Sequence, residues 1–167
     1  MTSGTREVRL VVDASPLIGL AKIGRLGLLE VLAERVVVPR AVWREVVEAG
    51  LGRPEAAVIA GAMAGKVEAG DPAWVAAFQM TVDAGEAEAI AVALVHPGSL
   101  LLIDDSAGRA WAVRQGVRCL GTAGLLLRAR RWGLVPSLGA ELRRLREHGL
   151  FLHPQVMATL LAAAGEG

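Results

Sequence analysis

Residues 8–16 read VRLVVDASP, and this stretch decides the fold class. A nearly continuous run of β-branched and aliphatic residues that ends in an acid, Asp13, is typical of a buried strand in a parallel sheet. The next two residues predict a helix start, with Ser15 as the N-cap and Pro16 at the first helical position. Further buried strands are predicted at 35–38 and 99–104, and a short strand is predicted at 116–120.

Helical patterns lie between and after these strands. The predicted helices cover 17–33 with a break near Gly24, then 39–49, 55–64, 72–80, 84–95, 106–115, 122–131, 137–147 and 154–164. Strands that alternate with helices favour an α/β domain with a mainly parallel central sheet flanked by helices. Because no repeat or linker divides the chain, we expect one domain over residues 1–167, whose last helix (about 154–164) packs on the body or on a partner.

The composition is that of a globular protein with a large core. Hydrophobic residues make up 53% of the chain and charged residues 21%. The single cysteine, Cys119, excludes an internal disulfide and suits a reducing compartment. The first residues lack the apolar stretch of a signal peptide, and no run approaches the roughly 18 residues of a membrane span. We therefore expect a cytoplasmic protein with no membrane partner.

Charge is distributed unevenly along the chain. Residues 1–105 contain 14 acidic and 9 basic side chains, whereas residues 106–167 contain 3 acidic and 9 basic ones. A protein that holds cations at one place and phosphates beside it would show this asymmetry. Two solvated faces of opposite charge would show it as well, so the asymmetry favours a nucleic-acid partner only weakly.

Two of the predicted strands end in acids. Asp13 follows the first strand, and the pair Asp104-Asp105 follows the strand at 99–104. In an open parallel sheet, ligands bind beyond the carboxyl ends of the strands, so these side chains are expected at one edge. Asp105 also suits the N-cap of the next helix, whereas Asp104 has no such local role.

Two helices supply further acids. Glu45 flanks the inward stripe of the helix at 39–49, where either a metal ion or an arginine would compensate its charge. Asp83 and Glu86 resemble a capping box at the start of the helix at 84–95, which is the alternative to a ligand role for Glu86. Glu88 lies about 200° around that helix from Glu86, so only one of the two is expected to face the strand ends.

Carboxylates that converge without a basic partner repel one another and need protons or cations. Hard oxygen ligands select Mg²⁺ or Mn²⁺, and the three histidines show no metal-ligand spacing. Such an ion activates water for attack on a phosphodiester. The candidate catalytic and metal-binding acids are therefore Asp13, Glu45, Glu86 and Asp104, with Asp105 as a further candidate metal ligand.

The order of these motifs resembles the PIN-domain nucleases over about residues 8–150. The motifs are VVDASP around Asp13 and Ser15, VPRAVWREV around Glu45, GEAEAIA around Glu86, and LIDD at Asp104-Asp105. Together with DDSAGR at 104–109 and GTAGLL at 121–126, they are similar to an uncharacterised prokaryotic subgroup allied to VapC-type toxins. The third acid is Glu where Asp is common in the toxins, and Glu88 or Asp105 offers an alternative alignment.

The resemblance implies a three-layer α/β fold and Mg²⁺- or Mn²⁺-dependent endoribonuclease activity. For a toxin member it also implies a homodimer or higher homo-oligomer and a cognate antitoxin. Ser15 is then expected to support a ligand carboxylate or a water molecule. The candidates for contact with the RNA backbone are Arg109, Arg128, Arg130 and Arg131.

Two other functions fit parts of the pattern. A PIN-like module with weak catalysis, acting by RNA or protein binding, would keep the fold, although no acid position is visibly lost. A phosphotransfer domain also uses strand-end aspartates. Its haloacid-dehalogenase form expects an acid where Ser15 stands, and its receiver form needs a late lysine, whereas the only lysines are Lys22 and Lys66.

Overall fold

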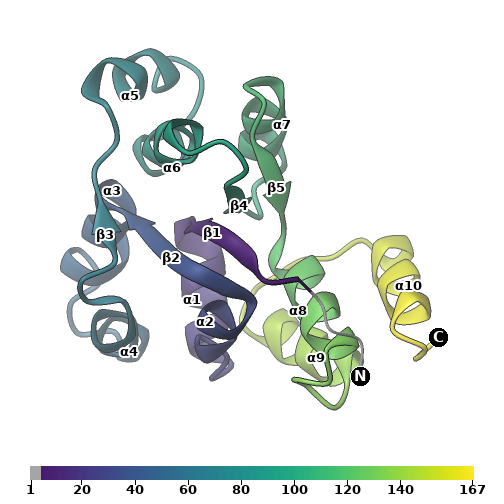
Figure 1. Cartoon of the computed structure of the whole chain (residues 1–167). Coiled ribbons are helices and arrows are strands. Elements are labelled where there is room, and N and C mark those ends of the chain that lie inside the picture. Colours follow the sequence, from purple (N-terminus) through teal and green to yellow (C-terminus); the bar gives the residue numbers. More distant parts are fainter. Residues whose placement is uncertain (1–4) are drawn as a thin grey trace.

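A five-stranded parallel sheet lies at the centre of the computed structural model, which describes residues 5–167 (Figure 1). The strand order is β3-β2-β1-β4-β5, and every neighbouring pair is parallel. The strands are β1 (Glu7–Val12), β2 (Ala33–Pro39), β3 (Val67–Glu68), β4 (Leu100–Leu102) and β5 (Arg118–Leu120). The predicted α/β class with a parallel sheet is confirmed. β3 was not predicted, because two residues are too few to show a period.

Helices connect the strands and cover both faces of the sheet (Figure 1). They are α1 (Ala14–Lys22), α2 (Gly27–Leu32), α3 (Arg40–Trp43), the π-helical segment η1 (Arg44–Glu48), α4 (Pro54–Met63), α5 (Pro72–Phe78), α6 (Ala84–Val95), α7 (Ser106–Arg114), α8 (Thr122–Arg131), α9 (Leu138–Glu147) and α10 (Pro154–Ala163). No helix among the described residues is long and apolar enough to cross a bilayer.

Alternate residues of each strand face two separate cores, which gives the fold three layers. Leu10, Val12, Leu100 and Leu102 belong to the larger core, formed with α1, α2, α4, α8 and α9. Val11, Val37, Leu101 and Ile103 belong to the smaller core, formed with α6 and parts of α5 and α7. Because both faces are covered, the inner parts of the central strands are apolar, as in Leu10–Val12 of β1 and Val36–Val38 of β2.

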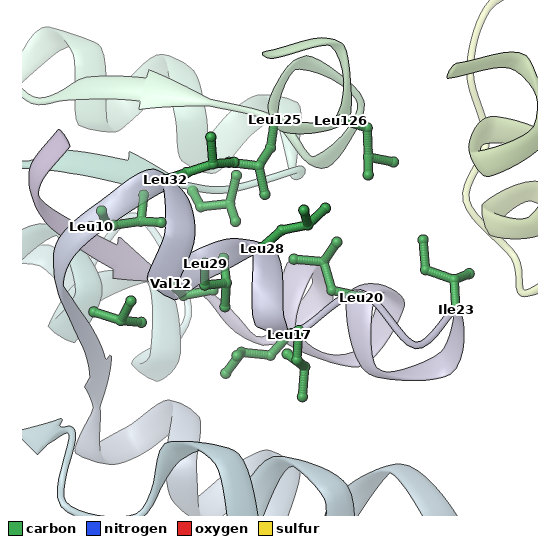
Figure 2. Close-up of a cluster of buried hydrophobic side chains, with 14 of the residues drawn as sticks. Leu10, Val12, Leu17, Leu20, Ile23, Leu28, Leu29, Leu32, Leu125 and Leu126 are labelled. Carbon is green, nitrogen blue, oxygen red and sulfur yellow. The ribbon is translucent and has the colours of Figure 1, made fainter. Parts of the chain in front are cut away.

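The larger core fixes α1 under the sheet. Figure 2 shows Leu17 and Leu20 of α1 among leucines of α2 and α8, with Val12 of β1 close by. Leu17 and Leu20 are 0% exposed. Burying such a side chain contributes about 1.5–3 kcal/mol, so α1 is firmly attached to the end of β1.

The chain reverses its direction of travel across the sheet at β1. From β1 it moves outward through β2 and β3, and it then returns to place β4 and β5 on the other side of β1. Such a switch point leaves a crevice at the carboxyl ends of the two central strands. Asp13 directly follows β1, and Asp104 lies two residues after the end of β4. The topology therefore brings the two acids to the same edge of the sheet.

The start of α1 differs from the prediction. Its N-cap is Asp13, and Ser15 lies inside the first turn, so the prediction of Ser15 as N-cap is wrong. The backbone N–H of Asp13 still donates to the carbonyl of Leu102 in the sheet, and the backbone of Asp13 is extended. The helix therefore begins two residues earlier than an N-cap at Ser15 would allow.

Pro39 is the N-cap of α3, which continues as the π-helical segment η1. In this segment the N–H of Ala49 donates to the carbonyl of Arg44 at 2.7 Å, which is the five-residue spacing of a π-turn. Val46 and Val47 of this segment are buried, while Ala49 is exposed. Glu45 lies in the first turn of this segment.

The last helix packs on the body of the molecule. Met157, Leu160 and Leu161 lie against the larger core, although no residue of α10 is fully buried. After α10, the carboxylate of Glu166 accepts hydrogen bonds from the Ser137 hydroxyl at 2.8 Å and from the Leu138 N–H at 2.7 Å. The end of the chain is thereby attached to the start of α9.

Candidate active site

A cleft of about 350 Å³ lies at the carboxyl ends of the central strands. Six acids line it, and they come from four separate parts of the chain. Five of them were predicted from the sequence as catalytic or metal-binding residues, and the sixth, Asp83, was predicted only as part of a cap. The six are Asp13, Glu45, Asp83, Glu86, Asp104 and Asp105.

Asp13 is the most buried of the six acids, with 7% of its surface exposed. Burial raises the pKa of Asp13, and the negative charges of Glu86, Asp83 and Glu45 raise it further. A hydrogen bond from the backbone of Ala14 offsets this only in part, and the resulting pKa is about 7. Placing a negative charge here is therefore costly unless a cation accompanies it.

Asp83 and Glu86 are bound to each other at the start of α6. The N–H of Glu86 donates to Asp83 Oδ1 at 2.9 Å, and the N–H of Asp83 donates to Glu86 Oε2 at 3.3 Å. The predicted capping box is thus present, and it leaves Glu86 Oε1 free of that bond. Burial and then the charge of Asp83 raise the pKa of Glu86. The Glu86 side chain therefore both caps α6 and lines the cleft.

Glu45 approaches the same helix start from η1. Its Oε2 would be 3.4 Å from a Cβ atom on Gly85, so its carboxylate lies directly beside the first turn of α6. Partial burial raises the pKa of Glu45, and the charge of Asp83 adds to this. No arginine pairs with Glu45 among the described ion pairs, so the expected alternative of an arginine partner is not what the structure shows.

Asp104 is held by the start of α8. Its Oδ1 accepts from the Thr122 N–H and its Oδ2 from the Thr122 hydroxyl, both at 2.7 Å. These bonds orient the carboxylate and still leave lone pairs on both oxygens. Asp105 is the N-cap of α7 and accepts from the Gly108 N–H at 2.7 Å. Both aspartates line the cleft, so the geometry keeps both as candidate ligands.

Glu88 is directed elsewhere. It is 8% exposed and accepts hydrogen bonds from the backbone N–H groups of Ala41 and Gly70. These bonds tie α6 to the start of α3 and to the segment before α5. Glu88 is not among the residues that line the cleft. Of the two alternatives left open by the sequence, Glu86 is the one beside the other acids.

None of the six acids of the cleft forms an ion pair with a described basic side chain. Among residues 5–167, the ion pairs involve acids such as Glu7, Glu68 and Glu141, and none of the six cleft acids. Asp13 and Asp104 therefore share one cleft without a guanidinium partner each. A shared metal site would have been excluded if Asp13 and Asp104 lay on opposite sides of the molecule, or if each carboxylate formed an ion pair with its own arginine.

Nearly the whole chain matches one protein-family model. A family model described as a PIN domain matches residues 9–166. The chain belongs to the PIN-domain family. PIN domains are generally nucleases and typically use divalent metal ions. A search of curated proteins found no match.

The acids of this PIN domain suit a hard divalent cation by their chemistry. All the candidate donors are carboxylate oxygens, and burial together with mutual repulsion raises the pKa values of Asp13, Glu45 and Glu86. In the described part of the chain, no three acidic, histidine or cysteine side chains are close enough to hold an ion as they stand. Binding would therefore require the longer side chains, Glu45 and Glu86, to change rotamer.

The four arginines predicted to contact RNA lie outside the cleft lining. Arg109 is nearest to the acids, since its Nη2 donates to the backbone carbonyl of Asp104 at 3.2 Å. Arg128 pairs with Glu7 at 2.8 Å, Arg130 pairs with Glu166 at 3.5 Å, and Arg131 donates to the Ala163 carbonyl at 3.5 Å. RNA contact by these four arginines stays a prediction.

Several cleft residues were not predicted as part of the site. Thr122 follows β5 by two residues, so a hydroxyl just beyond a third strand end was the available signal. Ser15 lines the cleft as expected, although inside the helix. Lys22 and the segment at 148–151 also line it, and no sequence pattern links these distant residues to the acids.

Gly108 allows α7 to approach Glu86. A Cβ atom at this position would lie 3.0 Å from Glu86 Cδ and 3.0 Å from Ile103 Cδ1. Ile103 is 0% exposed and has no room to yield. We expect Gly108→Ala to destabilise the fold by about 1–3 kcal/mol in urea unfolding and to weaken Mn²⁺ binding.

The control for this variant is Gly61→Ala in α4, where an added Cβ meets nothing within 4 Å. This change is expected to stabilise the helix by about 0.5–1 kcal/mol. If both variants unfolded at the same urea concentration, close packing at Gly108 would be wrong.

Proposed function

We propose that this PIN domain is a metal-dependent endoribonuclease that hydrolyses phosphodiester bonds of RNA. The observation that carries the proposal is the cleft in which acids from four chain segments meet without an ion-pair partner. Asp13, Glu45, Glu86 and Asp104 would hold Mg²⁺ or Mn²⁺, with Asp105 as a further ligand candidate. When bound, the ion supplies activation of water and stabilisation of the charge that develops on the phosphate.

The chain's own residues have distinct tasks in this proposal. Asp13 is fixed between β1 and α1 and gives the site a rigid reference point. The Thr122 hydroxyl and N–H hold Asp104 in one orientation. Glu45 and Glu86, which are longer and less buried, adjust to the substrate phosphate, and one carboxylate of the set accepts the proton of the attacking water.

A finer proposal follows from the resemblance of the four motifs. In it the protein is the toxin of a toxin–antitoxin pair, acts as a homodimer or higher homo-oligomer in the cytoplasm, and is held inactive by a cognate antitoxin. A small DNA-binding protein encoded beside this gene would support this role. The alternative, a catalytically weak PIN-like binding module, keeps the fold and needs no metal.

The test is cleavage of structured and unstructured RNA by the purified full chain. With Mn²⁺ or Mg²⁺ we expect cleavage products, and with EDTA in excess we expect none. Calorimetric titration with Mn²⁺ in the absence of RNA should show saturable binding. Absence of both metal binding and cleavage would favour the binding module, and cleavage that persists in EDTA would exclude the proposed use of the acids.

A further inference from the structure

The cleft has a second lining that carries no carboxylate. It is formed by one side of α1 and by the end of α9 with the turn that follows. The main contributors are Ile18 and Lys22 of α1, together with Leu145, His148, Leu150 and Phe151. Acids therefore lie at one part of the cleft, while apolar and basic side chains lie at another part of the same cleft.

The turn after α9 is held in a defined conformation. Gly149 has a φ of 97°, its N–H donates to the Arg146 carbonyl, and the Leu150 N–H donates to the Leu145 carbonyl. This pattern is a Schellman motif, which ends a helix with a left-handed residue. α1 approaches closely here, since a Cβ atom on Gly19 would lie 3.3 Å from Leu145 Cδ2. The turn is thus fixed against α1.

Phe151 projects from this turn into solvent. Its neighbours Leu150 and Leu152 pack on the larger core, whereas Phe151 is 80% exposed. A single exposed apolar residue is ordinary on a protein surface. This one, however, lines the acidic cleft, comes from an ordered turn, and is an aromatic ring of the kind on which unpaired bases stack.

Lys22 is the one lysine or arginine among the described residues that line this cleft. It is exposed, and no described ion pair uses it. Lys22 ends α1, and Asp13 caps the start of that helix, so the two are about 13 Å apart along the helix axis. Lys22 therefore lines the cleft from the opposite end of α1 to Asp13.

We propose that Phe151, Lys22 and His148 form a subsite for one unpaired nucleotide next to the bond that is cut. The base stacks on the Phe151 ring, while the Lys22 ammonium and an N–H of the His148 imidazole donate to a backbone phosphate. This subsite rests on the proposed ribonuclease function. It positions single-stranded RNA across the cleft and explains how an acidic site retains a polyanion.

The first test measures RNA affinity without turnover. The full chain carrying Asp13→Asn is titrated, in a fluorescence anisotropy assay, into a short labelled single-stranded RNA. Adding Phe151→Ala is expected to raise Kd about 5- to 150-fold, because base stacking on an aromatic ring contributes about 1–3 kcal/mol. Phe151→Trp keeps a stacking surface and is expected to stay within about twofold. Val8→Ala is the control, because Val8 is 68% exposed at the opposite end of β1.

The outcomes separate this inference from the proposed function. If Phe151→Ala binds RNA as tightly as its parent, the subsite is wrong even if the wild-type protein cuts RNA. If Phe151→Ala binds less tightly but the wild-type protein never cuts RNA, the subsite stands and the nuclease proposal fails. If no form of the protein binds RNA, both are wrong.

The second test uses the salt dependence of the same affinity. Lys22→Ala is expected to lower the slope of log Kd against log salt by about 0.7, the value for one phosphate contact on a single strand. Lys66→Ala is the matched control, because the Lys66 ammonium pairs with Glu30 at 3.0 Å and lines a different depression. Equal slopes for the two variants would remove Lys22 from the subsite.

Discussion

Asp13→Asn is expected to reduce metal-dependent RNA cleavage about 10³-fold or more while the fold is preserved. The change removes the carboxylate of the most buried acid of the cleft and keeps the shape of the side chain. A bound metal ion contributes several kcal/mol to charge stabilisation in the transition state, and each 1.36 kcal/mol corresponds to a factor of ten in rate. Initial rates on one RNA substrate, with Mn²⁺ in excess, measure the loss.

The control for this variant is Asp71→Asn. Asp71 is the N-cap of α5, where its Oδ1 accepts from the Ala73 N–H, and it is not a lining residue of the cleft. Asn caps a helix about as well as Asp, so this variant is expected to keep both stability and activity. If Asp13→Asn and the wild-type protein cleaved RNA at the same rate, the catalytic role assigned to the acids of the cleft would be wrong.

The second large effect concerns stability without metal. The pKa of Asp13 is about 7 in the folded protein, well above its ordinary value of 3.8, so the folded state binds a proton that the unfolded chain releases between about pH 4 and 7. The stability linked to this proton is present below about pH 4 and is lost as the pH rises through 7. At pH 8, metal-free Asp13→Asn is therefore expected to be more stable than the wild-type protein, by up to about 4 kcal/mol.

Metal should reverse this order. Mn²⁺ at a concentration above 1,000 times its Kd stabilises a protein that binds it by more than about 4.1 kcal/mol, which exceeds this deficit, and Asp13→Asn is expected to gain much less. Urea unfolding of both proteins at pH 4 and pH 8, with and without Mn²⁺, measures the crossover. The lowered pKa values of Glu7 and Glu166 affect both proteins equally and cancel in the comparison. If the free energy of unfolding in EDTA at pH 8 were higher for the wild-type protein than for Asp13→Asn, the claim that a charged Asp13 destabilises the metal-free fold would be wrong.

Much of this architecture was predictable because the deciding signals are local. The strand at 7–12 and its terminal acid are visible as one apolar run that ends at Asp13, and the capping box of Asp83 and Glu86 is visible as a spacing. Parallel strands then place the acids at one edge by topology alone. The choice between Glu86 and Glu88 followed from helical geometry once α6 was in place.

Other features depend on contacts that no local pattern records. The two-residue strand β3 exists because Val67 pairs with Val38 of β2. Asp13, rather than Ser15, begins α1 because the Asp13 N–H is bonded to the distant Leu102. The orientation of Asp104 by Thr122, and the position of Phe151 beside the acids, likewise depend on how α8 and α9 pack. These features could therefore be identified only in the folded structure.

The strand order also determines when the cleft can exist during synthesis of the chain. Asp13 and Glu45 are synthesised before β4, whose Leu102 carbonyl accepts from the Asp13 N–H, and before Thr122, which orients Asp104. A nascent chain that stops before residue 122 has the first acids without the partners that complete the set. The acidic cleft can therefore be complete only after residue 122 has been synthesised and α8 has folded, and until then Asp104 lacks the two groups that orient it.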